Sequence, residues 1–551
     1  MNNRKPLIFF SVWLIISLLQ AFFTNLSSDE GYYWFYTQHL QWGYYDHPPM
    51  VALLIKMGYS LFQNELGVRL MNVLVTSCNF LLLFRLIPEN LKQKNFIYLI
   101  LAAQPLLNYF SIIVFPDGPL LFFSLVFLLG YKRLITKNDW VSACWIGLSL
   151  TGMMYSKYHG VLLLLFTVLS NFSILRSKWF WISLLIPLTL SLPHLWWQYN
   201  NNFPSLQYHL LDRATGFRWT LVGQYISQQA PAIGPLFLIA AFGFKSENQF
   251  EKTLKYISVG TIFFFLFASC RGFVHFHWTS LALFPLSLMA MKYYTDRKKL
   301  LYWLTIPFLL IIIIYRIHIV FPFLPFKQND LGYYKNRDKW AEDISQLAKN
   351  RPVVFSEDFR EAGLYSFYSG KMATAIFSNI SRKTQFDLWG YEDSVQGREV
   401  LVVRKRAFDG SSQFESRLNK TINYLPVKNF ESYYNIPFEI KLTNKNDDSL
   451  QVSIKILNNR KTDLNFYIDP VLMQPVLFYQ LRKNNKEVLT DTLRIFTAQD
   501  KLVPGSSGVY EFSISIKDLT AGHYNFLAGF NYGSLPPSYN SMKNEFMINS
   551  R

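Results

Sequence analysis

The chain has 551 residues, of which 51% are hydrophobic and only 16% are charged. Soluble proteins usually carry about 25% charged residues, so this composition indicates a membrane protein. The formal net charge of +18 would also suit nucleic-acid binding, but no basic face or nucleic-acid motif accompanies it, and we expect no nucleic-acid partner. The three cysteines, Cys78, Cys144 and Cys270, all lie in apolar runs, which argues against a disulfide framework.

The first apolar run covers residues 6–24. No small-residue cleavage site follows it, so it predicts an uncleaved membrane span and not a signal peptide. Further apolar runs follow until about Lys327, where charged residues begin to concentrate. Runs of roughly 17–22 residues are long enough to cross a bilayer. This criterion predicts about eleven spans, at residues 6–25, 66–87, 95–114, 118–134, 140–156, 159–175, 179–197, 231–244, 254–270, 277–292 and 299–322.

The loops between these spans alternate in charge. Lys and Arg gather in every second loop, at Arg4 and Lys5, Lys92 and Lys94, Lys132, Arg133 and Lys137, Arg176 and Lys178, Lys245, Lys252 and Lys255, and Lys292, Arg297, Lys298 and Lys299. Because cytoplasmic loops are rich in Lys and Arg, we expect a cytoplasmic N-terminus. An odd number of spans then places the C-terminal region outside the cytoplasm.

With this orientation, the polar clusters of the membrane region all fall on the outer face. They comprise Asp29 and Glu30, Asp46 and His47, the turn at 116–119, residues 156–160, a long loop at 199–229 with Asp212, Arg213 and Arg218, and residues 271–278. Chance would scatter such groups over both faces, so the shared face predicts one site. The segment 48–62 is too short to span easily and carries Lys56, which predicts an interfacial helix.

Beyond Phe326 the sequence changes character. Helical spacing and strand-like runs alternate at 340–350, 352–356, 361–368 and 399–404, which predicts a small α/β module. From about Tyr434, short segments with period-two alternation are separated by turn residues, as in an antiparallel β-sandwich. The expected domains are a membrane domain at 1–325, an α/β module at 326–405 and a β-sandwich at 406–551.

Asp29 and Glu30 are adjacent carboxylates at the mouth of a membrane span, a costly arrangement unless the charge is used there. One interpretation is a general base that removes a proton from an acceptor. The alternative is a helix cap, since Ser28 and these two acids could begin a helix; their place among the outer-face clusters favours the first. Asp117 lies between two prolines in a turn-like motif, but it faces the same side, so we expect it to act with them.

A second set of candidates consists of cations and donors. Groups of this kind near a bilayer edge suit a phosphate, which accepts charge-assisted hydrogen bonds; the alternative for each is a snorkelling side chain. The set comprises His47, Lys157, His159, Arg271 and His277. His and carboxylate groups could also bind a divalent cation, but no two of them have helical i, i+4 spacing, so we do not expect an essential metal.

Aromatic residues are dense around the first outer loop. Tyr45 and its neighbours suit stacking on sugar rings, and they suit an interfacial aromatic belt equally well; Asp46 beside it is a further candidate substrate contact. No Gly-rich nucleotide loop, Walker sequence or Ser-His-Asp arrangement is present in the sequence. A soluble nucleotide-sugar donor is therefore not expected.

Four motifs follow one another along the first part of the chain: DEGYYW at 29–34, WGYYDHPP at 42–49, ELGVRL at 65–70 and FPDGPL at 115–120. In this order they resemble the bacterial branch of the dolichyl-phosphate-mannose protein mannosyltransferase superfamily, which includes the lipid A aminoarabinose transferases. The resemblance covers roughly residues 1–400 and leaves out the β-rich tail. It implies a polytopic α-helical fold of the GT-C glycosyltransferase type in a bacterial plasma (inner) membrane, with a periplasmic tail.

The resemblance also implies a reaction. A hexosyl- or pentosyltransferase of this kind moves a sugar from a polyprenyl-phosphate-linked donor to a protein, lipid or glycan acceptor on the outer face. Asp29 would be the general base or acceptor-orienting acid, with Glu30 beside it, and Asp117 would match the second acidic position.

Two positions depart from the family pattern. His47 stands where the family often has Lys before two prolines, at a position that contacts the donor phosphate, and histidine is only partly charged near neutral pH. Some relatives carry an Arg where this chain has Tyr32. Phosphate binding would then depend more on Lys157, Arg271 or His277.

Two other classes of function stay open. A transporter or flippase of lipid-linked sugars would place ionisable residues at mid-span, whereas here they lie at span ends. A membrane-anchored binding protein would act through its β-sandwich. Within the enzymes, a polymerase or ligase of lipid-linked glycans is the nearest alternative.

Overall fold

A computed structural model describes most of the chain. The described residues are 4–208, 217–324, 335–356, 358–376, 383–446, 448–466, 475–483, 486–497, 500–532, 537–541 and 544–548. Asp212 and Arg213 lie outside them. The chain divides into two compact units, Met1–Arg337 and Asp338–Arg551.

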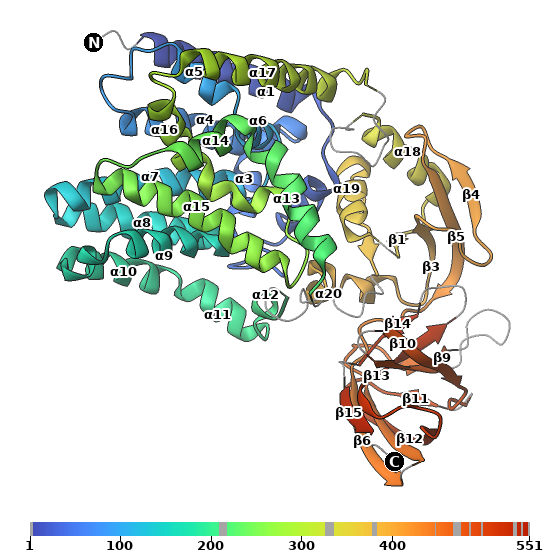
Figure 1. Cartoon of the computed structure of the whole chain (residues 1–551). Helices are drawn as coiled ribbons and strands as arrows, with labels where there is room; N and C mark the ends of the chain where they lie inside the picture. Colours follow the sequence, from blue (N-terminus) through green and yellow to red (C-terminus); the bar gives the residue numbers. More distant parts are fainter. Residues whose placement is uncertain are drawn as a thin grey trace. The chain divides into compact units, whose positions relative to one another are not determined.

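The N-terminal unit is helical (Figure 1). Its helices are α1 (Arg4–Phe23), α2 (Ser28–Tyr36), α3 (Met50–Tyr59), α4 (Glu65–Leu86), α5 (Phe96–Ala102), α6 (Pro105–Phe110), α7 (Asp117–Lys137), α8 (Trp140–Ser156), η1 (Tyr158–Gly160), α9 (Val161–Ser170), η2 (Phe172–Arg176), α10 (Lys178–Leu190), α11 (Leu192–Asn200), α12 (Pro204–Gln207), α13 (Trp219–Ile233), α14 (Pro235–Gly243), α15 (Gln249–Ser269), η4 (Phe276–Ala282), α16 (Leu283–Tyr293) and α17 (Lys298–Val320).

Each predicted span is helical, and the multi-pass membrane character is confirmed. Among the described residues, four helices are long and apolar enough to cross a membrane singly, namely α1, α4, α7 and α17. Two bent pairs, α10 with α11 at 44° and α13 with α14 at 97°, raise the number to six. The predicted span at 254–270 lies in the 21-residue α15, and the other predicted spans are built from shorter helices, because apolar runs reveal length but not breaks. Gly234, with φ of 90°, forms the sharp break before α14, a conformation that favours glycine.

The long loop expected at 199–229 is corrected by the structure, since this stretch contains α12 and most of α13. The short apolar segment after the first outer loop forms α3, as expected for a helix at 48–62. Its apolar residues are divided between a buried face, with Val51 and Ile55, and an exposed face, with Leu53 and Met57.

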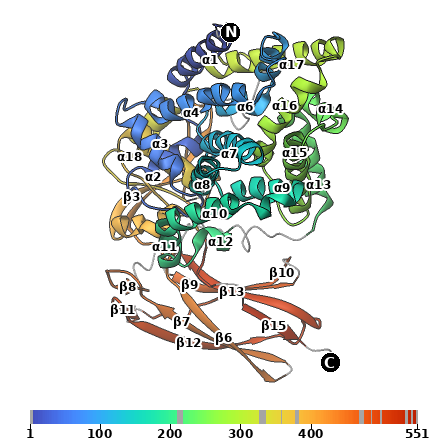
Figure 2. The same ribbon diagram turned by 90° about the vertical axis from the view of Figure 1, so that its left-hand side faces the viewer.

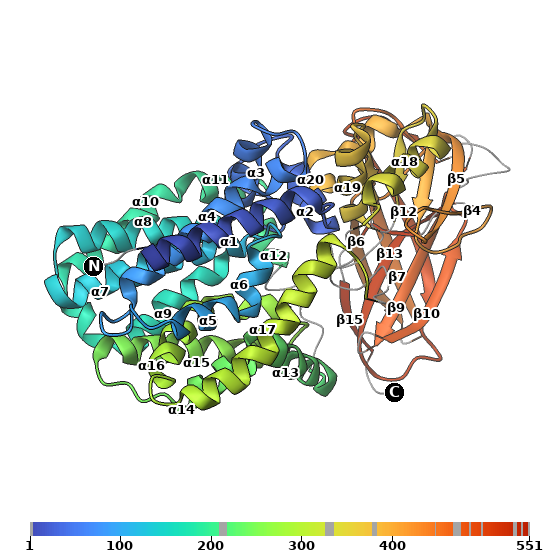
Figure 3. The ribbon, with the colours of Figure 1, turned by 90° about the horizontal axis from the view of Figure 1, so that it is seen from above.

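Helix α7 lies at the centre of the helical unit (Figure 2), where it contacts α4, α8 and η4. This arrangement is important for the site because Asp117, the first residue of α7, is thereby surrounded by other helices. Helices α1 and α17 come together near their C-terminal ends (Figure 3). Arg316 of α17 joins them through hydrogen bonds from its Nε to Gln20 Oε1 at 2.8 Å and from its Nη2 to Ser17 Oγ at 3.2 Å.

The C-terminal unit begins with an α/β part. Its elements are α18 (Arg337–Ala348), β1 (Val353–Phe355), α19 (Phe359–Ser369), β2 (Thr374–Ala375), α20 (Gln385–Trp389), η5 (Tyr391–Val395), β3 (Arg398–Arg404), β4 (Ser412–Glu415) and β5 (Thr421–Phe430). They form a five-stranded sheet in the order β2-β1-β3-β5-β4. Strands β1, β2 and β3 are parallel, and β5 pairs antiparallel with β3 and β4. The expected boundary at residue 405 therefore falls inside this sheet.

The rest of the unit is β-rich. Its strands are β6 (Phe438–Asn446), β7 (Ser449–Leu457), β8 (Leu464–Asn465), β9 (Pro475–Lys483), β10 (Lys486–Leu493), β11 (Lys501–Leu502), β12 (Ser507–Ser515), β13 (Gly522–Tyr532), β14 (Ser538–Tyr539) and β15 (Asn544–Ile548). One antiparallel sheet has the order β12-β7-β6, and a second has the order β10-β9-β13-β14, with β15 on β13. Alternate residues such as Val452, Ile454, Leu477 and Phe526 are buried in one shared core, which is the period-two pattern seen in the sequence.

Candidate active site

The acidic motif of the first outer loop begins a helix. Ser27 is the N-cap of α2, and its Oγ accepts a hydrogen bond from the Glu30 amide at 3.2 Å. Glu30 Oε2 in turn accepts from the Ser27 amide at 2.9 Å, which completes a capping box. The capping interpretation is therefore realised by Ser27 and Glu30, whereas Asp29 lies half-buried in the first turn.

Glu30 is also half of a fully buried ion pair. Arg69 of α4 contacts it with two parallel hydrogen bonds, Nε to Oε1 and Nη2 to Oε2, each 2.7 Å long. Glu30 Oε1 further accepts from the Val114 amide at 3.0 Å. The remaining Arg69 donors bind the carbonyl oxygens of Ala21, Thr24 and Asn25. These bonds hold α1, α2, α4 and the segment before α7 together.

Asp117 forms a second buried ion pair. Its Oδ2 accepts from Lys157 Nζ at 2.8 Å, and its Oδ1 accepts from Ser280 Oγ at 2.8 Å. Asp117 is inaccessible, and the Lys157 side chain is 7% exposed. Residues from three separate stretches, at the starts of α7 and η1 and within η4, therefore meet at one carboxylate. The pairing satisfies the need of Lys157 for a partner at the end of an apolar helix.

A close approach explains why glycine follows Asp117. A Cβ atom on Gly118 would lie 2.1 Å from Asn72 Oδ1. Asn72 is buried in α4 and donates from Nδ2 to the Phe110 carbonyl at 2.8 Å. Asp117 and Gly118 thus have separate functions. Asp117 binds Lys157, and Gly118, which has no Cβ atom, leaves room for the Asn72 side chain.

Asp46 and His47 are held by tyrosines of α2. Asp46 is buried and accepts from the hydroxyls of Tyr32 at 2.9 Å and Tyr36 at 3.3 Å. Burial, followed by the neighbouring Tyr32 and Asp46, raises the pKa of Tyr36 well above its ordinary value, so this phenol stays a donor. The Tyr33 hydroxyl lies 3.3 Å from His47 Nε2.

The same loop is fixed on its other side. Ser205 of α12 donates to the carbonyl oxygens of Tyr44 at 3.2 Å and Tyr45 at 3.1 Å, and the ring of Tyr45 is buried near that of Tyr208. His194 of α11 has Nδ1 at 2.6 Å from the Trp42 carbonyl and Nε2 at 3.0 Å from the Tyr158 hydroxyl. The loop is therefore tied to the segment that carries Lys157.

Ring contacts connect the imidazoles into one group. Ring centroids are 5.4 Å apart for Tyr33 and His47, 6.2 Å for Tyr33 and Phe115, and 5.3 Å for Phe115 and His277. His159 packs at 4.8 Å on Trp278, next to His277 in η4. Lys157, His159 and His47 all lie within electrostatic range of His277.

The predicted residues therefore separate into three sets. Asp46, His47, Asp117, Lys157, His159 and His277 belong to one connected group, with Tyr45 fixed beside it. Asp29 lies on the same helix as Tyr32 and Tyr33. Arg271 has an exposed side chain after α15, so the structure gives it no place in the connected group. Within the described residues, no three His, Cys, Asp or Glu side chains gather as a metal site.

Sequence reasoning missed Arg69 and Ser280. Arg69 lies in the ELGVRL motif, and an arginine inside an apolar span requires a partner, which could have linked it to Glu30. Ser280 gives no signal in the sequence, since a single serine in an apolar run is common.

Comparisons with known proteins agree with this architecture. The sequence model of the dolichyl-phosphate-mannose-protein mannosyltransferase family matches residues 46–197, which contain Asp46, Asp117 and Lys157. The lipid A galacturonosyltransferase RgtD of Rhizobium johnstonii is 25% identical over 317 residues, which make up 55% of this chain and 58% of RgtD. The chain thus spans less than two thirds of the length of this relative.

Two solved structures of ArnT from Cupriavidus metallidurans are similar in fold. The apo structure gives a TM-score of 0.54 at 12% identity, over 76% of this chain and 97% of ArnT. The structure bound to undecaprenyl phosphate gives a TM-score of 0.53 at 14% identity, over 77% of this chain and 98% of ArnT. The resemblance inferred from the motifs is thereby confirmed, and the chain is a multi-pass membrane protein whose fold is similar to that of ArnT and whose sequence is similar to the dolichyl-phosphate-mannose-protein mannosyltransferases.

Proposed function

We propose that this protein is a glycosyltransferase that moves a sugar from a polyprenyl-phosphate-linked donor to a lipid acceptor on the extracytoplasmic face of the membrane. The observation that carries the proposal is the connected group in which Lys157, paired with the buried Asp117, lies within electrostatic range of His277, as His47 and His159 do. A phosphate requires such fixed cations and donors. The undecaprenyl phosphate bound to ArnT and the lipid A substrate in the name of RgtD support the donor and acceptor classes.

In the proposed reaction, Asp29 accepts the proton of the acceptor hydroxyl. The acceptor oxygen then forms a bond to the anomeric carbon of the sugar, while the bond from that carbon to the phosphate oxygen breaks and its electron pair goes to the phosphate. Lys157, with His47 and His277, stabilises the charge that develops on the phosphate, and groups fixed before the reaction do this without reorganisation. Direct displacement of this kind inverts the configuration of the sugar.

Glu30 and Asp117 receive positioning roles. Glu30 accepts four hydrogen bonds, from Arg69, Ser27 and Val114, which leaves little capacity for a substrate proton. Asp117 is bound on both oxygens and orients Lys157. Of the three carboxylates predicted to be catalytic, Asp29 is therefore the one we assign to proton transfer.

We further propose the finer features of the architecture. The helical unit crosses the membrane about eleven times with a cytoplasmic N-terminus, as the loop charges favour. The two antiparallel sheets of the tail form an extracytoplasmic β-sandwich. Residues of both sheets are buried in one shared core, and both sheets belong to the same compact unit as the α/β part, which supports this assignment. The sugar is a hexose or a pentose.

The experiment that tests the reaction is an Asp29→Asn variant assayed for transfer from extracted polyprenyl-phosphate sugars. A positioned base contributes roughly 10²- to 10⁴-fold, so the rate should fall at least about 100-fold while expression and membrane insertion are retained. Asp296→Asn, at an exposed acid after α16, is the matched control and should keep wild-type turnover. Full activity of Asp29→Asn would refute the role, and flipping of the donor without transfer would favour a transporter.

A further inference from the structure

A pocket with a volume of about 310 Å³ lies in the α/β part of the C-terminal unit. It is formed where the parallel strands begin, by Val353 of β1, Thr374 of β2 and Arg398 of β3, and Tyr391 of η5 also lines it. Its volume is near the lower end of the roughly 300–1,000 Å³ typical of ligand sites. All its lining residues belong to the C-terminal unit, so it is separate from the group around Lys157.

The pocket is strongly cationic. Arg351, Lys371 and Arg398 line it, and its lining includes no Asp or Glu. Arg351 and Lys371 precede β1 and β2, and Arg398 is the first residue of β3, so chain folding and not a local charge run brings the three cations together. Arg351 forms an ion pair with one carboxylate, the half-exposed Glu399, at 3.3 Å, and within the described residues Lys371 and Arg398 have no ion pair.

Arg351 is held in a fixed position. Its Nε donates to the Ala348 carbonyl at 3.1 Å, and its Nη2 donates to the Leu347 carbonyl at 3.0 Å. These bonds terminate α18 and orient the guanidinium. Arg398 donates from Nη1 to the Ser394 carbonyl at 3.2 Å, and Lys371 is exposed, with its Nζ 3.5 Å from the Lys349 carbonyl. Three cations that line one pocket suit a single anionic group.

The rest of the lining is suited to a ring with hydroxyl groups. Asn350 and Ser394 offer an amide and a hydroxyl, and Tyr391 contributes an aromatic side chain. Thr374 also lines the pocket, is 2% exposed and has a buried Oγ1 without a hydrogen-bond partner in the described part of the chain. A bare inorganic anion would leave these groups and the apolar wall unused.

We propose that this pocket binds an anionic sugar residue, meaning one sugar ring that carries a carboxylate or a phosphate group. The anion contacts Arg351, Lys371 and Arg398, and the ring lies against Tyr391. The tail of the protein would then hold an acidic glycan at a pocket made of residues other than those of the connected group. The inference does not depend on the proposed glycosyltransferase activity.

Binding to the full-length protein in lipid nanodiscs tests the proposal. Saturation-transfer NMR would be recorded with galacturonic acid, galactose 6-phosphate, galactose and inorganic phosphate as separate probes. We expect at least one of the two anionic sugars to bind and galactose to bind at least tenfold more weakly, and the comparison of the two identifies the anion. The double variant Lys371→Glu/Arg398→Glu should weaken this binding at least tenfold.

The matched control is Lys441→Glu/Lys517→Glu, which makes the same charge change at two exposed lysines of the β-rich part. It should bind as the wild type does. Three results would each overturn the proposal: no binding of either anionic sugar, equal binding by the pocket variant, or inorganic phosphate binding as tightly as the sugars. Because binding is the readout, failure here is distinct from failure of the transfer assay.

Discussion

Two neighbouring carboxylates in α2 have different surroundings, and this difference governs their expected behaviour. Glu30 is buried with a bidentate arginine, whereas Asp29 is half-buried in the first turn of the helix. Removing one partner of a buried ion pair leaves the other charge uncompensated, which is costly even where the intact pair contributes little. Adjacent acids in one motif can therefore serve folding and chemistry separately.

The first prediction concerns Glu30→Gln. Because Arg69 would remain buried without its counter-charge, the free energy of unfolding should fall by about 3–5 kcal/mol. Asp29→Asn should change it by less than about 1 kcal/mol. Denaturant unfolding of both variants in detergent compares them, and equal stability would contradict the structural role of Glu30.

Lys157 provides the second prediction. Lys157→Gln removes the cation that we place at the donor phosphate, so kcat/KM should fall about 100-fold or more. Ser280→Ala removes only the neutral hydrogen bond to Asp117 and should cost less than about tenfold. Steady-state kinetics with the lipid-linked donor separates the two, and a similar effect of both variants would argue that the whole pair acts only in folding.

At this scale, the sequence motifs named residues that the structure brings close together, but they did not reveal which of these residues pair. Asp117 and Lys157 could be chosen from the sequence because each lies at the end of an apolar run, yet their contact depends on how α7 and α8 pack. Arg271 illustrates the opposite case, since its charge and position favoured the site but its side chain is exposed. The partner of a charge is a tertiary property that spacing along the chain cannot reveal.

Among the secondary-structure elements, the start of α7 is constrained by the Asn72 side chain. Gly118→Ala would force a Cβ atom against Asn72 Oδ1, and overpacking of this kind typically costs about 1–3 kcal/mol. We expect lower stability together with lower activity, because Asp117 is the preceding residue. Thermal unfolding and the transfer assay measure the two effects.

Gly223→Ala in α13 is the control for this substitution. No atom lies within 4 Å of a Cβ placed there, and alanine favours a helix by roughly 0.5–1 kcal/mol over glycine. The control should therefore be neutral or slightly stabilising. If both variants behaved alike, the close packing at Gly118 would lose its assigned importance.

The sequence predicts helices and strands well where the pattern of apolar residues extends over a long segment. The alternation at 450–456 became β7, and the run at 299–322 became α17. No strands were predicted at β4 and β5, and the expected domain boundary at 405 separates β5 from β3, its neighbour in the sheet. The bends between α10 and α11 and between α13 and α14 were missed because hydropathy averages over a break of one residue.

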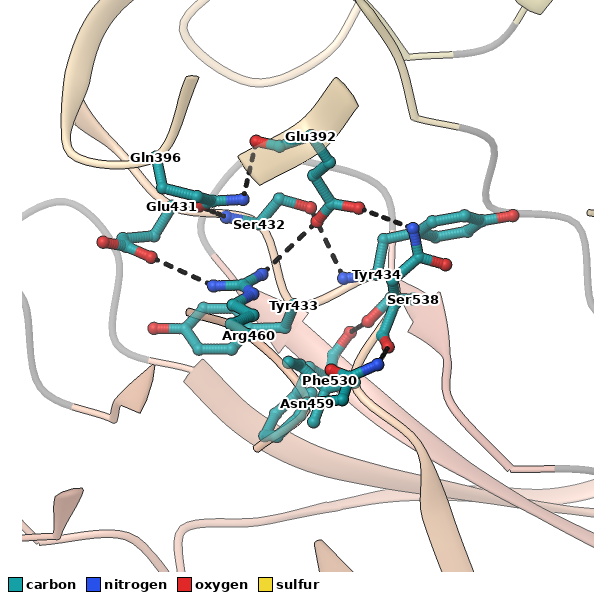
Figure 4. A network of polar contacts seen from close by, with 12 residues as sticks. Glu392, Gln396, Glu431, Ser432, Tyr433, Tyr434, Asn459, Arg460, Phe530 and Ser538 are labelled. Carbon is teal, nitrogen blue, oxygen red and sulfur yellow. Dashed lines mark hydrogen bonds and ion pairs between the residues drawn. The ribbon is translucent and has the colours of Figure 1, made fainter. Parts of the chain in front are cut away.

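For the C-terminal unit, a polar network joins η5 to the loop after β7 (Figure 4). Arg460 Nη2 lies 3.3 Å from Glu392 Oε1, and its Nη1 lies 3.4 Å from Glu431 Oε2. Asn435 donates to Glu392 Oε2 at 3.0 Å and lies within 3.4 Å of Asp387 Oδ1. The Arg460 guanidinium thus faces two carboxyl groups, Glu392 and Glu431, and Asn435 links Glu392 to the nearby Asp387.

This excess of carboxyl groups over cations predicts that the stability of the folded state depends on pH. Burial, only partly opposed by Arg460, raises the pKa of Glu392 to about 7, and burial raises that of Asp387 to about 6. The folded state therefore binds more protons than the unfolded state, and its stability should decrease as the pH rises from about 4 to 7. Glu392→Gln should make the stability depend less steeply on pH, so its melting temperatures at pH 5 and pH 8 should differ less than those of the wild type. An unchanged difference would contradict the prediction.

The orientation of the whole protein in the membrane gives the last prediction. In a cysteine-free background, Trp42→Cys should react with an impermeant maleimide in intact spheroplasts, because its position is exposed in the first outer loop. Lys94→Cys, at an exposed position between α4 and α5, should react only after permeabilisation. The reverse pattern would place the site on the cytoplasmic side and exclude the proposed reaction.

The antiparallel pairing of β5 with β3 has a consequence for experiments that shorten the chain. A truncation at residue 405 would remove β5 and expose the backbone of β3 as a new sheet edge, and such edges promote aggregation. Lost activity would then be mistaken for a requirement for the tail. A stop codon after Phe430 preserves the five-stranded sheet, so it is the cleaner place to ask what the remaining strands contribute.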